Sequence, residues 1–188
     1  MSILIGISGA PCVGKSTLAA KLFSRLKEMG LNVEMALEYC KEYAIEKREI
    51  TPFSEFLFFG VQSHLESRLF DKTQIIVSDS LCCLAGYYEH LYNGSNSLSE
   101  ACKAFYKRAE ENGVKVLNFF LPMRKNYNPK GRFQTKEQAV FIDKDMREWL
   151  DSEGYTYEVL DCPDSQRVEK IIERLKEVTD IGEENIDG

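Results

Sequence analysis

A glycine-rich loop near the start of the chain constrains the fold more than any other feature. An apolar run, residues 2–8, ends at this loop, and a helical pattern with leucines at 18, 22 and 26 follows it. The loop matches the phosphate-binding pattern G-x-x-x-x-G-K-[ST] from Gly9 to Ser16. Glycines in such a loop allow the backbone to wrap around phosphate oxygens, and the helix N-terminus attracts the anion. The sequence therefore predicts a strand-loop-helix unit that binds a nucleoside triphosphate.

The motif also assigns roles to individual residues. Lys15 is expected to reach the β- and γ-phosphates, and the Ser16 hydroxyl is expected to ligate Mg²⁺. ATP and Mg²⁺ are thus the expected cofactors. The residues predicted to hold the nucleotide are Gly9, Ala10, Pro11, Cys12, Val13, Gly14, Lys15, Ser16 and Thr17.

Asp79 is the second candidate for the magnesium site. It follows the short apolar strand predicted over residues 74–78, where a phosphate-binding protein of this kind keeps a carboxylate for its metal. Asp is also a preferred N-cap residue, so the alternative interpretation is a helix cap.

The remaining pattern alternates strands with helices, which predicts a parallel sheet with helices on both faces. The predicted strands are 2–8, 31–37, 74–78, 114–121 and 155–160. The predicted helices are 15–29, 38–48, 53–71, 81–92, 98–112, 137–152 and 164–177. The fold class is therefore α/β, a three-layer sandwich around five parallel strands.

The 188 residues suit a single domain, which we place at 1–178, followed by an acidic, flexible tail at 179–188. The apolar N-terminal run is too short to span a membrane and lacks the flanks of a signal peptide, so we expect a cytoplasmic protein that does not contact membranes. Six cysteines without metal-ligand spacing are interpreted as reduced thiols. The net charge of −6 gives no general attraction for nucleic acids.

The end of the second strand carries the candidate for the acceptor side. Glu38 stands there, where it could orient or deprotonate an acceptor hydroxyl, or alternatively cap the following helix. The segment Glu38-Tyr39 to Glu42-Tyr43, the pair Asp79-Ser80 and a tyrosine-rich stretch with Tyr88 and Tyr92 resemble the kinase domain of bacterial nicotinamide riboside kinases and related small P-loop kinases. The resemblance implies a P-loop NTPase fold of the nucleoside monophosphate kinase type. It covers roughly residues 1–175.

Residues 59–69 also resemble the substrate helix of deoxynucleoside kinases, in which a glutamine contacts the nucleobase. This resemblance implies a substrate role for Gln62, and we add Arg68 and Tyr39 as further candidates. The alternative is that Gln62 and Arg68 are solvated helix positions and that Tyr39 lines the core or a groove.

A basic segment, 122–136, is the clearest charge anomaly of the chain, and we call it the lid segment. Its basic residues are Arg124, Lys125, Lys130, Arg132 and Lys136. We expect Arg124 and Arg132 to neutralise charge on the transferred group. The alternatives are a solvated basic loop or a strip that follows a nucleic acid backbone, which we favour less.

Together these features predict an ATP-dependent kinase that phosphorylates a nucleoside, a nucleotide or a nucleoside-like small molecule. One alternative is a kinase acting on a hydroxymethylated base in DNA. The other is a P-loop NTPase that acts as a switch or binding module. A homodimer is compatible with either class.

Overall fold

The computed structural model describes residues 1–123 and 135–179. Five strands form one sheet in the order β2-β3-β1-β4-β5, and every neighbouring pair is parallel. The strands are β1 (Ser2–Ser8), β2 (Val33–Ala36), β3 (Ile75–Ser78), β4 (Val114–Phe120) and β5 (Glu158–Val159). The predicted five-stranded parallel sheet is therefore confirmed.

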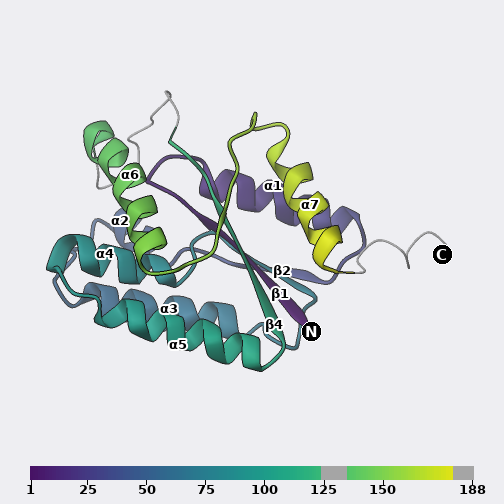
Figure 1. The fold of residues 1–188 in the computed structure, drawn as a ribbon, viewed down its shortest axis with the longest axis horizontal. Coiled ribbons are helices and arrows are strands. Elements are labelled where there is room, and N and C mark those ends of the chain that lie inside the picture. The colour runs from purple at the N-terminus through teal and green to yellow at the C-terminus, as the bar shows by residue number, and fades with distance from the viewer. Residues whose placement is uncertain (124–134, 180–188) are drawn as a thin grey trace.

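Helices cover both faces of this sheet, as Figure 1 shows with α1 and α7 on one side and α3 and α5 on the other. The helices are α1 (Lys15–Glu28), α2 (Cys40–Glu46), α3 (Ser54–Ser67), α4 (Cys83–Asn93), α5 (Ser97–Glu111), α6 (Lys136–Ser152) and α7 (Arg167–Val178). The three-layer α/β architecture expected from the sequence is thus present.

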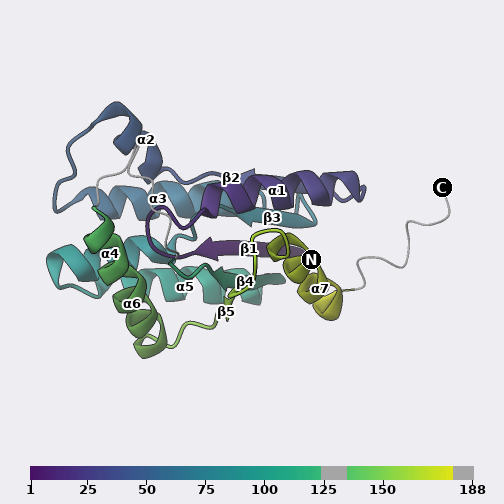
Figure 2. The same ribbon diagram turned by 90° about the horizontal axis from the view of Figure 1, so that it is seen from above.

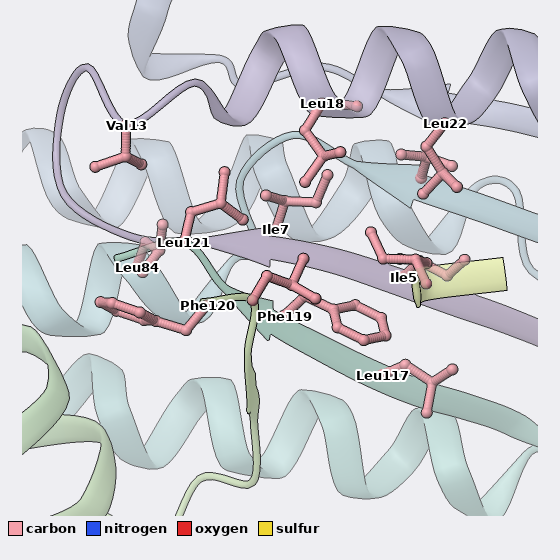
Figure 3. Packing of buried hydrophobic residues seen from close by; sticks show 14 of the residues in the cluster. Ile5, Ile7, Val13, Leu18, Leu22, Leu84, Leu117, Phe119, Phe120 and Leu121 are labelled. Carbon is pink, nitrogen blue, oxygen red and sulfur yellow. The ribbon is translucent and has the colours of Figure 1, made fainter. Parts of the chain in front are cut away.

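The alternation of side chains along β1 explains the two layers. Ile5 and Ile7 are completely buried on the face that packs against α1 and α7, and Leu18 and Leu22 point from α1 toward them (Figure 3). Leu4 lies on the opposite face, in a second cluster with residues of α4 and α5. Because β1 is buried on both faces, its sequence is an almost continuous apolar run.

Strand register brings the loops that follow the strands to one edge. Gly6 of β1 pairs with Ser78 of β3, and Ala36 of β2 pairs with the same serine. The residues just beyond these strands, among them Asp79 and Glu38, therefore lie at the edge where the glycine-rich loop begins. Figure 2 shows α2, α4 and α6 gathered beyond the arrowhead of β1, at this same edge.

Several element boundaries differ from the predicted ones, and two of the differences have clear physical reasons. The last strand is only Glu158–Val159 because β4 offers it partners at Phe119 and Phe120 alone. Residues 155–157, which the sequence placed in this strand, precede β5. Tyr155 among them stacks on Trp149, with ring centroids 5.4 Å apart. Helix α3 ends at Ser67, and tight turns follow it up to Asp71, whose φ of 59° is left-handed.

Among the described helices, none is long and apolar enough to cross a membrane.

Candidate active site

The loop between β1 and α1 has the backbone conformation that its glycines allow. Gly14 caps α1 with a φ of 97°, and Gly9 has a φ of 139°. A Cβ atom at Gly9 would lie 2.5 Å from the carbonyl oxygen of Leu121, so the loop passes too close to β4 for any side chain there. Cys12 adopts a left-handed φ of 68° without being a glycine. The residue spacing of the motif does not reveal that conformation.

Lys15, the first residue of α1, is buried and turns its ammonium group back to the loop. Its Nζ donates hydrogen bonds to the carbonyl oxygens of Gly9, at 2.9 Å, and Ala10, at 3.1 Å. The loop thus holds this positive charge at its own centre, between the glycines that would surround a phosphate group.

Ser16 contacts a residue that the sequence did not single out. Lys41 of α2 donates a hydrogen bond from its Nζ to the Ser16 Oγ over 2.9 Å. This contact joins the first turn of α1 to the first turn of α2, and no motif in the sequence indicates it.

Asp79 lies directly after β3 and is 1% exposed. Its backbone N–H donates to the carbonyl oxygen of Ala36 at 3.1 Å. Its Oδ1 is buried and has no hydrogen-bond partner within the described residues. A buried carboxylate oxygen without a hydrogen-bond partner is suited to bind a hard cation such as Mg²⁺, or to accept a hydrogen bond from a water bound to that cation. Asp79 therefore fits the magnesium role expected from the sequence, and the assignment of Mg²⁺ to Ser16 and Asp79 stays a prediction.

A cleft of about 530 Å³ opens beside the loop. Lys15 and Pro11 line it on the phosphate side, and Glu38 and Lys41 line it on the side of β2 and α2. Its far wall comes from the connection to α3 and from α4, with Glu55, Tyr88 and Tyr92. The rings of Tyr88 and Tyr92 are nearly parallel, with centroids 5.9 Å apart. The structure thus brings Lys15 and Glu38 to one cavity with an aromatic wall.

Two of the carboxyl groups that line this cleft, those of Glu55 and Glu38, bear on pKa values there. Glu55 is 5% exposed, and burial together with the nearby Glu89 carboxylate raises the pKa of Glu55 to about 8. Glu55 is therefore mostly a neutral, proton-donating group near pH 7. Burial is the main cause that raises the pKa of the Tyr88 phenol well above its usual value, and the charge of Glu38 is the second cause. Glu38 thus faces the aromatic wall.

The three substrate candidates differ in their placement. Gln62 is buried and lines a small recess of about 30 Å³ that shares Glu38, Glu55 and Tyr88 with the cleft. Its Oε1 accepts a hydrogen bond from the Tyr39 backbone N–H at 3.2 Å, and its Nε2 donates to the Ser78 Oγ at 3.4 Å.

Tyr39 packs its ring edge-on against Tyr43 and Phe58, 5.9 and 6.1 Å away, and it is not among the residues that line the cleft. Arg68 is exposed at the end of α3, while the cleft is formed at the start of that helix. The structure therefore places Gln62 in a recess beside the cleft and leaves Arg68 away from it.

Sequence reasoning missed a buried network behind Asp79. Glu66 of α3 is completely buried, and its Oε1 accepts hydrogen bonds from the Ser78 hydroxyl at 2.9 Å and from the Cys82 backbone N–H at 3.1 Å. Desolvation raises the pKa of Glu66 to about 8. The signal was available, because Gln62 and Glu66 follow the buried Phe58 at four-residue spacing and so share its face of α3.

Both lid arginines, Arg124 and Arg132, lie outside the described residues, as do Lys125 and Lys130. Lys136 is the first residue of α6 and is exposed. This helix begins with a capping box, in which the Thr135 Oγ1 accepts from the Gln138 backbone N–H at 3.3 Å and the Gln138 Oε1 accepts from the Thr135 N–H at 2.7 Å.

The fold and the loop define a P-loop nucleotide-binding protein. A family model described as an AAA domain matches residues 4–169, so the chain belongs to this family of P-loop domains. None of the curated proteins compared with the chain matches it significantly.

Solved structures with the same fold include several kinases. The NadR protein in complex with NR is similar with a TM-score of 0.71 and 18% sequence identity, over 95% of this chain and 52% of the NadR chain. Deoxyadenosine kinase from M. mycoides with bound dATP has a TM-score of 0.56 and 15% identity, over 92% of this chain and 98% of the kinase. An APS kinase from Mycobacterium tuberculosis has a TM-score of 0.52 and 12% identity, over 93% of this chain and 97% of the kinase. The chain spans about half the length of the NadR protein.

Proposed function

We propose that this protein is an ATP-dependent phosphotransferase that moves the γ-phosphoryl group to a nucleoside, a nucleotide or a nucleoside-like small molecule. One observation carries the proposal: Lys15 of the phosphate-binding loop and Glu38 at the end of β2 line the same cleft. A donor phosphate held by the loop and an acceptor hydroxyl beside Glu38 would share one cavity. Phosphoryl transfer depends on that proximity.

Each residue has a defined part in this reaction. The loop amides and Lys15 hold the triphosphate, and Ser16 and Asp79 hold Mg²⁺, which supplies charge neutralisation on the β- and γ-phosphates. Glu38 orients the acceptor hydroxyl and takes its proton as the acceptor oxygen bonds to the γ-phosphorus. The bond from phosphorus to the β–γ bridging oxygen breaks, and ADP leaves. Arg124 and Arg132 of the lid segment would neutralise charge on the transferred group.

The cleft supports a nucleoside-like acceptor through its size and walls. Its volume of about 530 Å³ is within the range of small-molecule sites. Tyr88 and Tyr92 offer aromatic surface for a base or another flat ring, and Glu55 can donate a hydrogen bond to it. The structural neighbours that hold NR and dATP agree with an acceptor of this class.

A direct test is a transfer assay with γ-labelled ATP and Mg²⁺ against nucleosides, nucleoside monophosphates, nicotinamide riboside and duplex DNA with hydroxymethylated bases. We expect one labelled small-molecule product that is absent with Lys15→Ala. Label in DNA alone would establish the base-kinase alternative. Release of labelled phosphate without any acceptor product, stimulated by a protein partner, would establish the switch alternative.

A further inference from the structure

The proposed reaction assigns no role to Lys41, a positively charged residue of the candidate site. It lines the cleft on the same side as Glu38, and its Nζ lies 2.9 Å from the Ser16 Oγ. The Ser16 hydroxyl is the group that the proposed function assigns to Mg²⁺. A lysine ammonium therefore stands where the divalent cation would bind.

Among the described cations that line the cleft, Lys41 has the fewest polar partners. Within residues 1–123 and 135–179, the Ser16 hydroxyl is its single polar partner. Lys15 donates to two carbonyl oxygens, and Arg48 forms an ion pair with Glu46 and lies over the Tyr43 ring. An ammonium group has three donors and is half-buried here, so it has two donors and most of its charge available for an anion.

Lys41 and a magnesium ion exclude each other at Ser16. A cation bound to the hydroxyl oxygen would lie within a few ångströms of the ammonium, and like charges at that distance repel strongly. The lysine is free to move, because none of residues 40–46 in the described helix α2 is buried and the side chain has four flexible methylene groups.

With a triphosphate in the loop, the terminal phosphate is an anionic group near Ser16 that can receive the displaced ammonium. Ser16 would hold Mg²⁺ where the cation neutralises the β- and γ-phosphates, so oxygens of both would lie near this hydroxyl. Lys41 reaches this hydroxyl from α2 and lines the cleft together with Glu38, whereas Lys15 belongs to α1 and turns back to the loop. The γ-phosphoryl oxygens that face the acceptor are therefore the ones within its reach.

We propose that Lys41 is a second phosphate-binding lysine, which gives up the Ser16 hydroxyl to Mg²⁺ and then binds the terminal phosphoryl group from the acceptor side. The inference rests on the proposed function, because it requires a triphosphate in the loop. It adds a contact that distinguishes a triphosphate from a diphosphate.

Calorimetric titration separates this role from a structural one. The ligands are Mg²⁺·ADP and Mg²⁺ with the non-hydrolysable β,γ-imido analogue of ATP, and the variants are Lys41→Ala, Lys41→Arg and Lys21→Ala. We expect Lys41→Ala to reduce the preference for the triphosphate analogue over ADP by roughly tenfold or more, which is the usual strength of a charged hydrogen bond. Lys41→Arg should keep most of the preference.

Lys21 provides the matched control, since it is an exposed lysine of α1, the helix that carries Ser16, and forms no salt bridge within the described residues. Its replacement should leave both affinities unchanged. A Mg²⁺ titration in the presence of ADP gives a second readout. Lys41→Ala should lower the half-saturating Mg²⁺ concentration roughly threefold, because no ammonium then competes for the hydroxyl.

The outcomes distinguish the two proposals. If the parent protein binds both nucleotides and Lys41→Ala keeps the parent's preference and Mg²⁺ dependence, the inference about Lys41 is wrong while the proposed function stands. If the parent protein binds neither nucleotide, both fail. Far-UV circular dichroism confirms that each variant is folded.

Discussion

At the scale of single residues, the site depends on charged groups that come from distant parts of the chain. Lys15 is held by carbonyl oxygens of its own loop, whereas Asp79 and Glu38 arrive on neighbouring strands. Each of these residues therefore has a separable contribution, and each can be tested by a substitution that leaves the sheet intact.

Replacing Lys15 by alanine should reduce phosphoryl transfer on the order of 10²–10³-fold, because a preorganised positive charge at the phosphates is lost. The variant should remain folded, since the ammonium contacts the loop and not the apolar core. Steady-state turnover of ATP and a thermal melt measure the two effects, with Lys21→Ala as control. Turnover close to that of the parent in a folded Lys15→Ala protein would contradict the assigned role.

Glu38→Gln should separate donor binding from transfer. The amide keeps the size of the side chain but cannot accept the acceptor proton, so we expect transfer to fall about 10²–10⁴-fold. The affinity for Mg²⁺·ADP should stay close to that of the parent. Single-turnover kinetics and calorimetry provide the measurements. A matching loss of nucleotide affinity would instead assign Glu38 to the metal.

Glu66 predicts a dependence of stability on pH. Its pKa of about 8 in the folded protein lies above the ordinary value of 4.5, so the folded protein holds a proton that the unfolded chain releases. The free energy of unfolding should therefore fall as the pH rises from about 4.5 to about 8, by up to about 1.4 kcal/mol per pH unit. Glu55 acts in the same direction, because burial also raises its pKa to about 8.

Glu66→Gln should remove the contribution of Glu66 to this pH dependence of stability. An amide stays neutral at every pH, and its oxygen still accepts hydrogen bonds from Ser78 and Cys82. Urea unfolding at several pH values between 5 and 8 measures the slope. The exposed Glu173 of α7 provides the control, as Glu173→Gln should leave the slope unchanged. An identical slope in Glu66→Gln and the parent would show that Glu66 is ionised in the folded protein.

At the scale of elements, α2 is attached to the molecule through aromatic rings. Tyr43 packs edge-on against Phe58 and Tyr39, with ring centroids 4.9 and 5.9 Å away, and none of residues 40–46 in this described helix is buried. The helix carries Lys41 and follows Glu38, so the ring contacts fix the acceptor side of the cleft.

Removing the central ring should therefore loosen α2 alone. Tyr43→Ala deletes two edge-on pairs and the contact with Arg48, so we expect amide hydrogen exchange in residues 40–46 to accelerate roughly tenfold. Exchange in the sheet should not change. Phe141→Ala is the control, because Phe141 is 56% exposed and lies on another helix, α6. Unaltered exchange of α2 in Tyr43→Ala would show that other contacts hold it.

The order and type of these elements were predictable because each has a local signal. Apolar runs indicated the strands, and leucines at helical spacing indicated α1. The boundaries were less predictable because they depend on partners: β5 is short since β4 pairs with it at Phe119 and Phe120 only. The same holds for the site. The loop motif identified Lys15 and Ser16, whereas the contact of Lys41 with Ser16 exists only once two helices meet.

At the scale of the whole molecule, the phosphate-binding loop is continuous with β1, a strand in which every residue is buried. Nucleotide binding should therefore stabilise the fold as a unit. At an ADP concentration 100 times its dissociation constant, with Mg²⁺, the free energy of unfolding should rise by about 2.7 kcal/mol. Urea denaturation followed by tryptophan fluorescence measures it, because Trp149 is buried against α4. The Lys15→Ala variant should show a much smaller gain.

The position of β1 in the sheet also has a consequence for biosynthesis. This strand is made first, but its two neighbours, β3 and β4, begin only at residues 75 and 114. As the chain leaves the ribosome, the loop that binds phosphate emerges early, on a strand whose hydrogen-bonding partners have not yet been synthesised. The pairing of β1 with β4 is complete only when residue 120 has left the exit tunnel, so the apolar β1 stays without this partner while the more than one hundred residues between them are synthesised.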